Sequence, residues 1–256
     1  MDNLTLETLI AAAVFIGTRV AGLMVFCPFL GSNAIPARLK AVLVVVITII
    51  LYPLRGGMSL DLNSWHWAGV LLSEAVIGLM LGLAANLMME APMMAGQILG
   101  VQMGYSLATL FDPQTQADTP VLGEFHRLAA LLIFLQLDVH HWLLRAVAAS
   151  FGYLPAGTAV ANLNAVSGLL HATGGIFLAG VQIAAPALVA TIVADVALGF
   201  LGKASPQLPV LFIGLAVKNV LGLALLFFLV AYWPNSFSQK FAASIALGER
   251  LLHLSH

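Results

Sequence analysis

The chain has 256 residues, of which 61% are apolar and 8% are charged, and its formal net charge at pH 7 is −1. Ordinary soluble domains are roughly 45–50% apolar and about 25% charged. This composition therefore excludes a soluble enzyme and a disordered segment, and the lack of any basic run excludes a nucleic-acid binder. The single cysteine, Cys27, rules out an internal disulfide. We therefore predict that the chain is embedded in a lipid bilayer.

Apolar windows of membrane-spanning length recur along the chain. A spanning helix needs about 20 residues, and two less regular stretches, 41–54 and 92–111, lie between the windows. β-Branched residues in 41–54 are compatible with a strand, but an open strand leaves its backbone unsatisfied in lipid, so we predict helix. Breaks rich in Pro, Gly, Asn or Asp separate the segments. The fold class is predicted to be all-α, with integral-membrane helical hairpins packed in a multi-subunit assembly. The windows are 9–30, 67–89, 125–149, 176–201 and 208–233, and the breaks are 32–36, 55–64, 112–119, 155–164 and 204–209.

The first window is expected to be a retained membrane segment rather than a cleaved secretory signal. Asp2 and Glu7 stand where a signal carries basic residues, and Arg19 lies in the middle of the apolar run. Retention places this charged side chain within the membrane part of the protein.

Several ionisable residues lie within or at the ends of apolar windows. Each costs on the order of 2.5–3.5 kcal/mol if it faces lipid at the bilayer centre, so each is expected to pair, meet water or face protein. A proton or substrate path is one interpretation, and ion pairs such as Asp195 with Lys203 or Lys218 are the other. We favour ion pairs because no acidic pair recurs in two halves. The residues are Arg19, Glu74, Glu90, Asp138, Arg145, Asp195 and Lys218.

Glycines recur every four residues in two of the apolar segments. Residues four apart share one face of a helix, and the lack of a side chain lets two backbones approach closely. The glycine faces either pack within this chain or pack against neighbouring subunits, with glutamines as interhelical hydrogen-bond donors. The predicted interface comprises Gly78, Gly82, Gly96, Gly100 and Gly104, with Gln97 and Gln102.

Residues 105–125 break the apolar pattern. Asp112-Pro113 and Asp118–Pro120 are turn and helix-start signals. Non-helical backbone at membrane depth must be buried in protein or line a water-filled cavity. The segment is therefore either an ordinary extramembrane loop or a re-entrant plug, in which Leu110 and Phe111 block a passage.

Motifs that indicate catalysis are missing from the sequence. It contains no H-E-x-x-H, no G-x-S-x-G and no Walker-type phosphate loop. Asp138-Val139-His140-His141 is the one cluster that suggests a metal, but adjacent histidines point about 100° apart on a helix. We expect a histidine pair at a membrane interface, and we predict no enzyme activity, no metal site and no cofactor.

The order and spacing of these motifs resemble the FliR-type subunit of the bacterial flagellar export gate, whose relatives (the FliR/SctT family) serve virulence-associated type III secretion. The resemblance covers nearly the whole chain, and the intact D-P-x₆-P spacing looks more flagellar than virulence-associated. It rests on Arg19, Ile35–Arg38, the helix with Glu74, Gly78 and Gly82, the stretch AGQILGVQMGYSLATLFDPQTQADTPVLGEF (95–125), and Ala197–Leu201 with Pro206–Leu208.

This resemblance implies a structural, pore-forming subunit of the flagellar type III protein export gate in the bacterial inner membrane, within the flagellar basal body. Such a subunit conducts unfolded flagellar proteins. Implied partners are FliP-like and FliQ-like subunits, an FlhB-like switch protein, exported flagellar proteins and membrane lipid, with no nucleic acid. A virulence export gate is the alternative. A small-molecule secondary transporter is less favoured, since residues 146–194 contain no Asp, Glu, Lys or Arg.

The resemblance also implies a division of the chain and a plug. Residues 1–175 would be FliP-like, with the plug loop near 105–120. Residues 176–256 would be a FliQ-like helical pair followed by an amphipathic terminal helix. In the family, the loop after the glycine-rich helix plugs the central pore. Carried onto this sequence, the plug comprises Gly104, Tyr105, Ser106, Leu110, Phe111, Asp112, Pro113 and Pro120.

Overall fold

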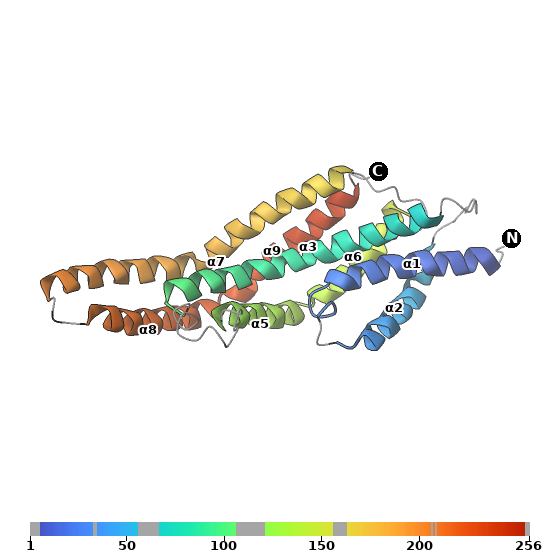
Figure 1. Ribbon diagram of the computed structural model, residues 1–256. Coiled ribbons are helices and arrows are strands. Elements are labelled where there is room, and N and C mark those ends of the chain that lie inside the picture. The colour runs from blue at the N-terminus through green and yellow to red at the C-terminus, as the bar shows by residue number, and fades with distance from the viewer. Residues whose placement is uncertain are drawn as a thin grey trace. The chain divides into compact units, whose positions relative to one another are not determined.

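The computed structural model describes residues 6–32, 35–55, 67–105, 121–155, 163–205, 207 and 209–253. Within these residues the regular elements are all helical, which confirms the predicted fold class. Figure 1 shows them in chain order. They are α1 (Leu6–Phe26), α2 (Ala37–Leu51), the 3₁₀ turn η1 (Tyr52–Arg55), α3 (Trp67–Gln102), α5 (Val121–Gln136), α6 (Val139–Tyr153), α7 (Leu163–Ala204), α8 (Val210–Val230) and α9 (Trp233–His253).

Four of the described helices are long and apolar enough to cross a membrane. They cover Leu9–Phe26, Trp67–Gln102, Gly174–Ala204 and Phe212–Val230, and α5 with α6 makes a fifth if that bent pair is one span. The predicted window at 176–201 is therefore confirmed as helix, and those at 9–30 and 208–233 are confirmed as helix up to Phe26 and over Val210–Val230.

Helix α3 differs from the prediction of two segments, 67–89 and 92–111. It runs unbroken through Pro92 and ends at Gln102. Proline removes one backbone donor, but a helix tolerates this where neighbouring helices satisfy the freed groups.

The glycine that was predicted to extend the face of α3 instead ends the helix. Gly104 has φ 85°, a left-handed conformation that glycine adopts without steric cost. The Tyr105 N–H donates to the Gly100 carbonyl at 2.9 Å, and the Gly104 N–H donates to the Val101 carbonyl at 3.1 Å. This pair of hydrogen bonds is the Schellman arrangement, which closes a helix.

The predicted single window 125–149 is broken into α5 and α6. The break lies at Asp138, whose backbone is left-handed with φ 53° and ψ 30°. Hydropathy carries no information about such a backbone kink, because both flanking helices remain apolar.

The chain forms two compact units whose segments interleave along the sequence. Unit 1 comprises Met1–Met88, Phe134–Thr173 and Lys240–His256, and unit 2 comprises Met89–Ile133 and Gly174–Gln239. One boundary lies inside α7 after Thr173. The division into a FliP-like part, 1–175, and a FliQ-like part, 176–256, stays a prediction.

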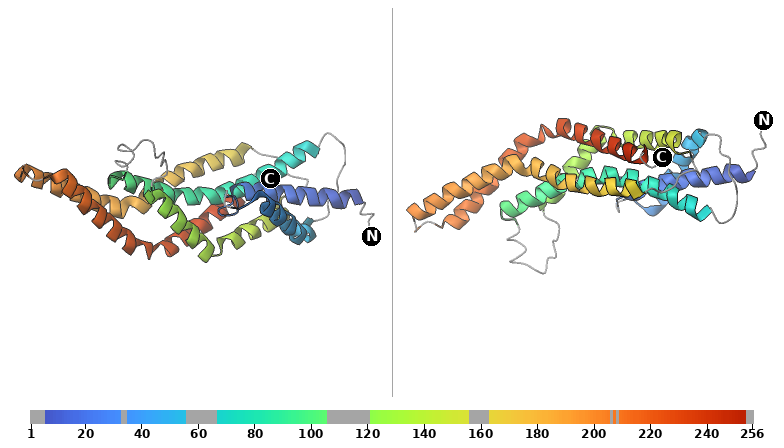
Figure 2. Two further views of the ribbon diagram at one scale, coloured as in Figure 1. Left: turned by 60° about the horizontal axis from the view of Figure 1, so that its bottom comes forward. Right: turned by 90° about the horizontal axis from the view of Figure 1, so that it is seen from above.

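Unit 1 has its core where α1 packs closely on the first part of α3. A Cβ on Gly22 would lie 2.5 Å from the Ala75 carbonyl oxygen, and one on Gly82 would lie 2.5 Å from the Leu23 carbonyl oxygen. Contacts this short exclude any side chain, so both backbones require glycine. Figure 2 shows α1 alongside the start of α3 in two views. The buried side chains include Phe15, Ile16, Val20 and Leu23 of α1, Ile77 and Leu81 of α3, and Leu143 and Val147 of α6.

Unit 2 has its core between the end of α3, the start of α5 and the middle of α7. The buried cluster is Ala95, Leu99, Met103, Leu122, Ala184 and Ala187. The second half of α7 and α8 lie side by side as an antiparallel hairpin in both views of Figure 2. The two helices of this hairpin are the least buried of the four candidate spans. Of the α7 window 28% is buried and of the α8 window 17%, compared with 50% for the windows of α1 and α3.

Candidate functional site

The predicted plug begins and ends in unit 2. Gly104 and Tyr105 follow the end of α3, and Val121 begins α5. The remaining predicted plug residues, Ser106, Leu110, Phe111, Asp112, Pro113 and Pro120, lie outside the described residues. The site is therefore built from the residues that flank 106–120.

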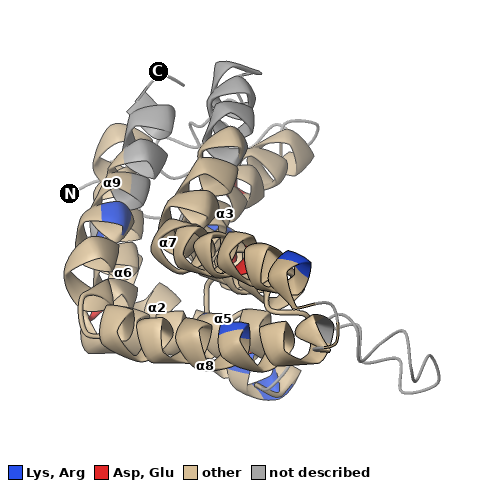
Figure 3. Cartoon of the chain, turned by 90° about the vertical axis from the view of Figure 1, so that its left-hand side faces the viewer, with Lys and Arg blue, Asp and Glu red and all other residues tan. Residues whose placement is uncertain are grey.

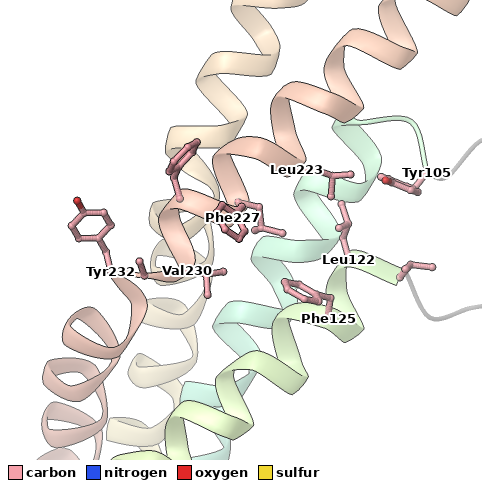
Figure 4. A pocket seen from close by; sticks show the side chains of 11 residues that line it. Tyr105, Leu122, Phe125, Leu223, Phe227, Val230 and Tyr232 are labelled. Atoms are coloured by element: carbon pink, nitrogen blue, oxygen red, sulfur yellow. The ribbon is translucent and has the colours of Figure 1, made fainter.

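Residues at both of these ends line one apolar pocket with a volume of about 850 Å³. Tyr105 and Val121 both line it, so segment 106–120 leaves the described structure at one pocket residue and returns at another. Figure 4 shows the lining side chains of α5 and α8 around the opening. None of the eleven lining residues is charged. They are Tyr105, Val121, Leu122, Phe125, Leu223, Leu226, Phe227, Phe228, Val230, Ala231 and Tyr232.

A polar network holds the end of α3, next to this pocket. The Gln102 side-chain amide donates to an Asp195 carboxylate oxygen at 2.9 Å, and the Lys218 ammonium lies 3.0 Å from the other oxygen. Lys218 also donates to the Gln102 carbonyl at 3.2 Å. That carbonyl is one of the groups that a helix C-terminus leaves unpaired, and a cation there is electrostatically favoured. The network therefore joins α3, α7 and α8.

The predicted charge pair of α7 and α8 lies at the surface of the chain rather than in its core. The Lys218 side chain is 18% exposed and the Asp195 side chain is 44% exposed. The Lys, Arg, Asp and Glu positions coloured on the helices in Figure 3 are sparse. An exposed ion pair in an apolar helical hairpin indicates a surface that meets either water or another polar protein group.

The glycine face near the pocket contacts α5 of the same chain. A Cβ on Gly96 would overlap the Leu122 carbonyl oxygen, whereas one on Gly100 would meet only the Leu122 Cβ at 4.0 Å. Gln97 is half-buried beside them. The structure thus places Gly96 at a close contact within the chain, while Gly100 has room for a methyl group.

The other predicted charges, Arg19 and Glu74, form a buried cluster in unit 1. The Arg19 Nε lies 2.6 Å from the Glu74 carboxylate, and neither side chain is exposed. Arg19 Nη1 donates to the Ser150 hydroxyl at 2.9 Å, and Nη2 donates to the Leu154 carbonyl at 3.0 Å. The Phe151 ring centroid lies 4.1 Å from the guanidinium carbon.

This cluster favours the structural interpretation of the buried charges over a proton path. The planar guanidinium is matched on three sides by acceptors and on its face by an aromatic ring, which is how a buried arginine is stabilised. Gly78 belongs to the same contact, since a Cβ there would overlap the Arg19 carbonyl oxygen. Sequence reasoning identified Arg19 and Glu74 but missed Ser150, whose signal is a single serine in the apolar second half of α6.

The histidine pair at the start of α6 does not diverge as predicted. The ring centroids of His140 and His141 are 4.2 Å apart. Asp138 lies close to both, with its Oδ1 atom 3.9 Å from His140 Nε2 and 3.3 Å from His141 Nδ1. The angle of about 100° describes where side chains leave a helix, but imidazoles extend far enough to converge beyond that point.

The sequence matches a known family over most of its length. The profile of the family described as bacterial export proteins, family 1, matches residues 10–244. The flagellar biosynthetic protein FliR of Escherichia coli (strain K12) is 32% identical over 81% of this chain and 80% of its own length. The FliR protein of Pectobacterium carotovorum is 31% identical, with 84% and 83% covered. The secretion system apparatus protein SsaT of Salmonella typhimurium is 26% identical, with 84% and 85% covered.

Proposed function

This chain belongs to the bacterial export proteins, family 1, and we propose that it is a structural, pore-forming subunit of the flagellar export gate. Its FliR relatives and its membrane-type helices support a subunit of the flagellar protein export apparatus in the bacterial inner membrane. Members of the family are structural components of protein export machinery. The proposal concerns the pore, through which unfolded flagellar proteins would cross the membrane.

The pocket lined by both Tyr105 and Val121 carries the plug proposal. Segment 106–120 connects two walls of one apolar pocket, and α3 ends there at a left-handed glycine cap. The Gln102–Asp195–Lys218 network ties that helix end to the α7–α8 hairpin. A segment with fixed end points beside an apolar pocket is suited to close a narrow passage. We propose that Gly104, Tyr105, Ser106, Leu110, Phe111, Asp112, Pro113 and Pro120 form this plug.

Exposed apolar faces support the proposal of partner subunits. Large apolar side chains are exposed on α2, such as Val42, Val45 and Ile49, and on α8, such as Phe212 and Val220. Patches of this kind mark protein or membrane contacts. We propose that FliP-like and FliQ-like subunits and lipid cover them, that an FlhB-like protein also contacts the complex, and that 1–175 and 176–256 are the FliP-like and FliQ-like parts.

Ion conductance of the reconstituted gate tests the plug. A chain that lacks residues 110–118 is co-expressed with its partner subunits, and the purified complex is inserted into planar bilayers. We expect at least a tenfold increase in conductance over the intact complex. A control deletion of residues 57–63, between η1 and α3 in the sequence, should leave conductance at the wild-type level.

Wild-type conductance of an assembled 110–118 deletion would reject the plug. If that deletion fails to assemble, a variant with serine at both Leu110 and Phe111 keeps the length of the segment and removes its bulk. An assembled double variant with unchanged conductance would reject the plug equally.

FliR proteins are 24–32% identical to this chain, and SsaT is 26% identical. A flagellar role is favoured over a virulence role because the FliR proteins of Escherichia coli and Pectobacterium carotovorum, at 32% and 31%, exceed SsaT in identity. Complementation tests this choice. Expressed in an Escherichia coli strain that lacks its own FliR protein, the chain should restore swimming in soft agar. An expressed, membrane-inserted chain that restores secretion only in a virulence-type system would contradict it.

A further inference from the structure

We propose that Asp138, His140 and His141 form a binding site for a divalent transition-metal ion of the Zn²⁺ class at the start of α6. One carboxylate and two imidazoles supply the N and O ligands that Zn²⁺ accepts. Their ligand atoms all lie within 4.8 Å of one another. The site belongs to unit 1 and does not depend on the proposed pore.

The distances from Asp138 Oδ1 to the two histidine nitrogens are close to those of a tetrahedral site. Metal–ligand bonds of about 2.0–2.2 Å place neighbouring ligand atoms about 3.3–3.6 Å apart. The 3.3 Å between Asp138 Oδ1 and His141 Nδ1 meets this range, and the 3.9 Å between Asp138 Oδ1 and His140 Nε2 exceeds it by a few tenths of an ångström. Small side-chain rotations close that gap, because the Asp138 carboxylate is 65% exposed.

The backbone at Asp138 directs its carboxylate to the histidines. An aspartate that precedes a helix usually accepts a hydrogen bond from the first turn. Within the described structure the Asp138 side chain makes no such capping bond. Its left-handed backbone, with φ 53°, is an uncommon conformation that is found at functional sites.

The orientation of His140 selects its ligand nitrogen. His140 Nδ1 is buried, which leaves Nε2 as the nitrogen that faces Asp138. The positive end of the α6 dipole disfavours a cation, and the Asp138 carboxylate offsets this because it carries a full negative charge at the metal. Three protein ligands leave a fourth position open for water.

Zinc titration of the purified full chain in detergent tests the site, with an affinity tag that contains no histidine. ZnCl₂ followed by calorimetry should give one bound ion per chain, and Co²⁺ should give a visible d–d absorption that Zn²⁺ abolishes. D138N and H141Q should each weaken Zn²⁺ binding at least tenfold, and so should H140Q. H253A, which removes a histidine far away in the sequence, should bind like the wild type.

Two outcomes would overturn the proposal. One is a wild-type chain that binds no Zn²⁺ in this titration, which would show that Asp138 and the two histidines form an ion pair and no metal site. The other is a triple variant, D138N with H140Q and H141Q, that binds Zn²⁺ with unchanged affinity. H141Q is decisive if another variant fails to fold, since the His141 side chain is 57% exposed and its replacement leaves the core intact.

Discussion

Two regions of the molecule contain an ion pair between apolar helices, but their surroundings differ. Around α1, Arg19 and Glu74 are completely buried, and 50% of the α1 window is buried within the chain. On the α7–α8 hairpin, Asp195 and Lys218 are partly exposed, and only 17% of the α8 window is buried. In the first region the ion pair and its surroundings are completed within one chain. The hairpin leaves a larger share of its surface exposed, and we propose that other subunits cover it.

The largest expected effect comes from removing one partner of the buried pair. Arg19→Met leaves the Glu74 carboxylate buried without its counter-charge, which costs roughly 3–5 kcal/mol. We expect a smaller amount of the chain in the membrane and a large drop in Tm. Circular dichroism of the chain purified in detergent measures the Tm.

The double variant R19M with E74M sharpens this test. It removes both charges together, so it should recover most of the lost stability. If R19M alone has the Tm of the wild type, the α1 region does not depend on its buried pair and the contrast with the hairpin fails.

A smaller effect is expected at the glycine face of α3. Gly78→Ala places a methyl group against the Arg19 carbonyl oxygen, and forcing extra volume into a packed contact costs roughly 1–3 kcal/mol. Gly69→Ala lies on the same helix with no neighbour within 4 Å and is the matched control. Equal Tm values for the two alanine variants would show that α1 and α3 do not touch closely at Gly78.

Gly199 of the hairpin should respond in the opposite direction. A Cβ on Gly199 has no neighbour within 4 Å, and alanine in a helix interior is favoured over glycine by up to about 1 kcal/mol. Gly199→Ala should therefore leave the isolated chain as stable as before or slightly more stable. Co-purification with the partner subunits then reports separately on packing between chains, and a destabilised isolated chain would contradict the account.

The smallest effect is expected from Lys218→Met. Partly exposed ion pairs contribute about 0–1 kcal/mol, so the Tm of the isolated chain should change by little. A drop as large as that of R19M would mean that the hairpin pair is as structural as the buried one, and the contrast between the two regions would be lost.

Much of the helical architecture could be predicted from apolar periodicity and turn residues. The end of α2 before Pro53 and the break between α7 and α8 follow from proline and glycine chemistry. The unbroken α3 and the break at Asp138 could not be predicted in this way. Proline normally ends or kinks a helix, so the sequence predicted a break that α3 does not show at Pro92, while a left-handed aspartate leaves no trace in hydropathy.

The site shows the same division between local and distant information. Sequence reasoning identified Arg19 and Glu74 as residues that need partners, but they are 55 positions apart and nothing local joins them. Asp195 was predicted to pair with Lys203 or Lys218, and the structure pairs it with Lys218. The convergence of His140 and His141 was missed, because helix geometry fixes where a side chain starts rather than where its ring ends.

Photo-cross-linking in native membranes tests most directly whether other subunits complete the α7–α8 hairpin. Benzoylphenylalanine replaces Phe212, which is 73% exposed, or Phe15 of α1, which is 1% exposed, as the matched control. We predict an adduct between position 212 and another export-apparatus chain, and none from position 15. A position 212 that cross-links only to lipid would contradict the account.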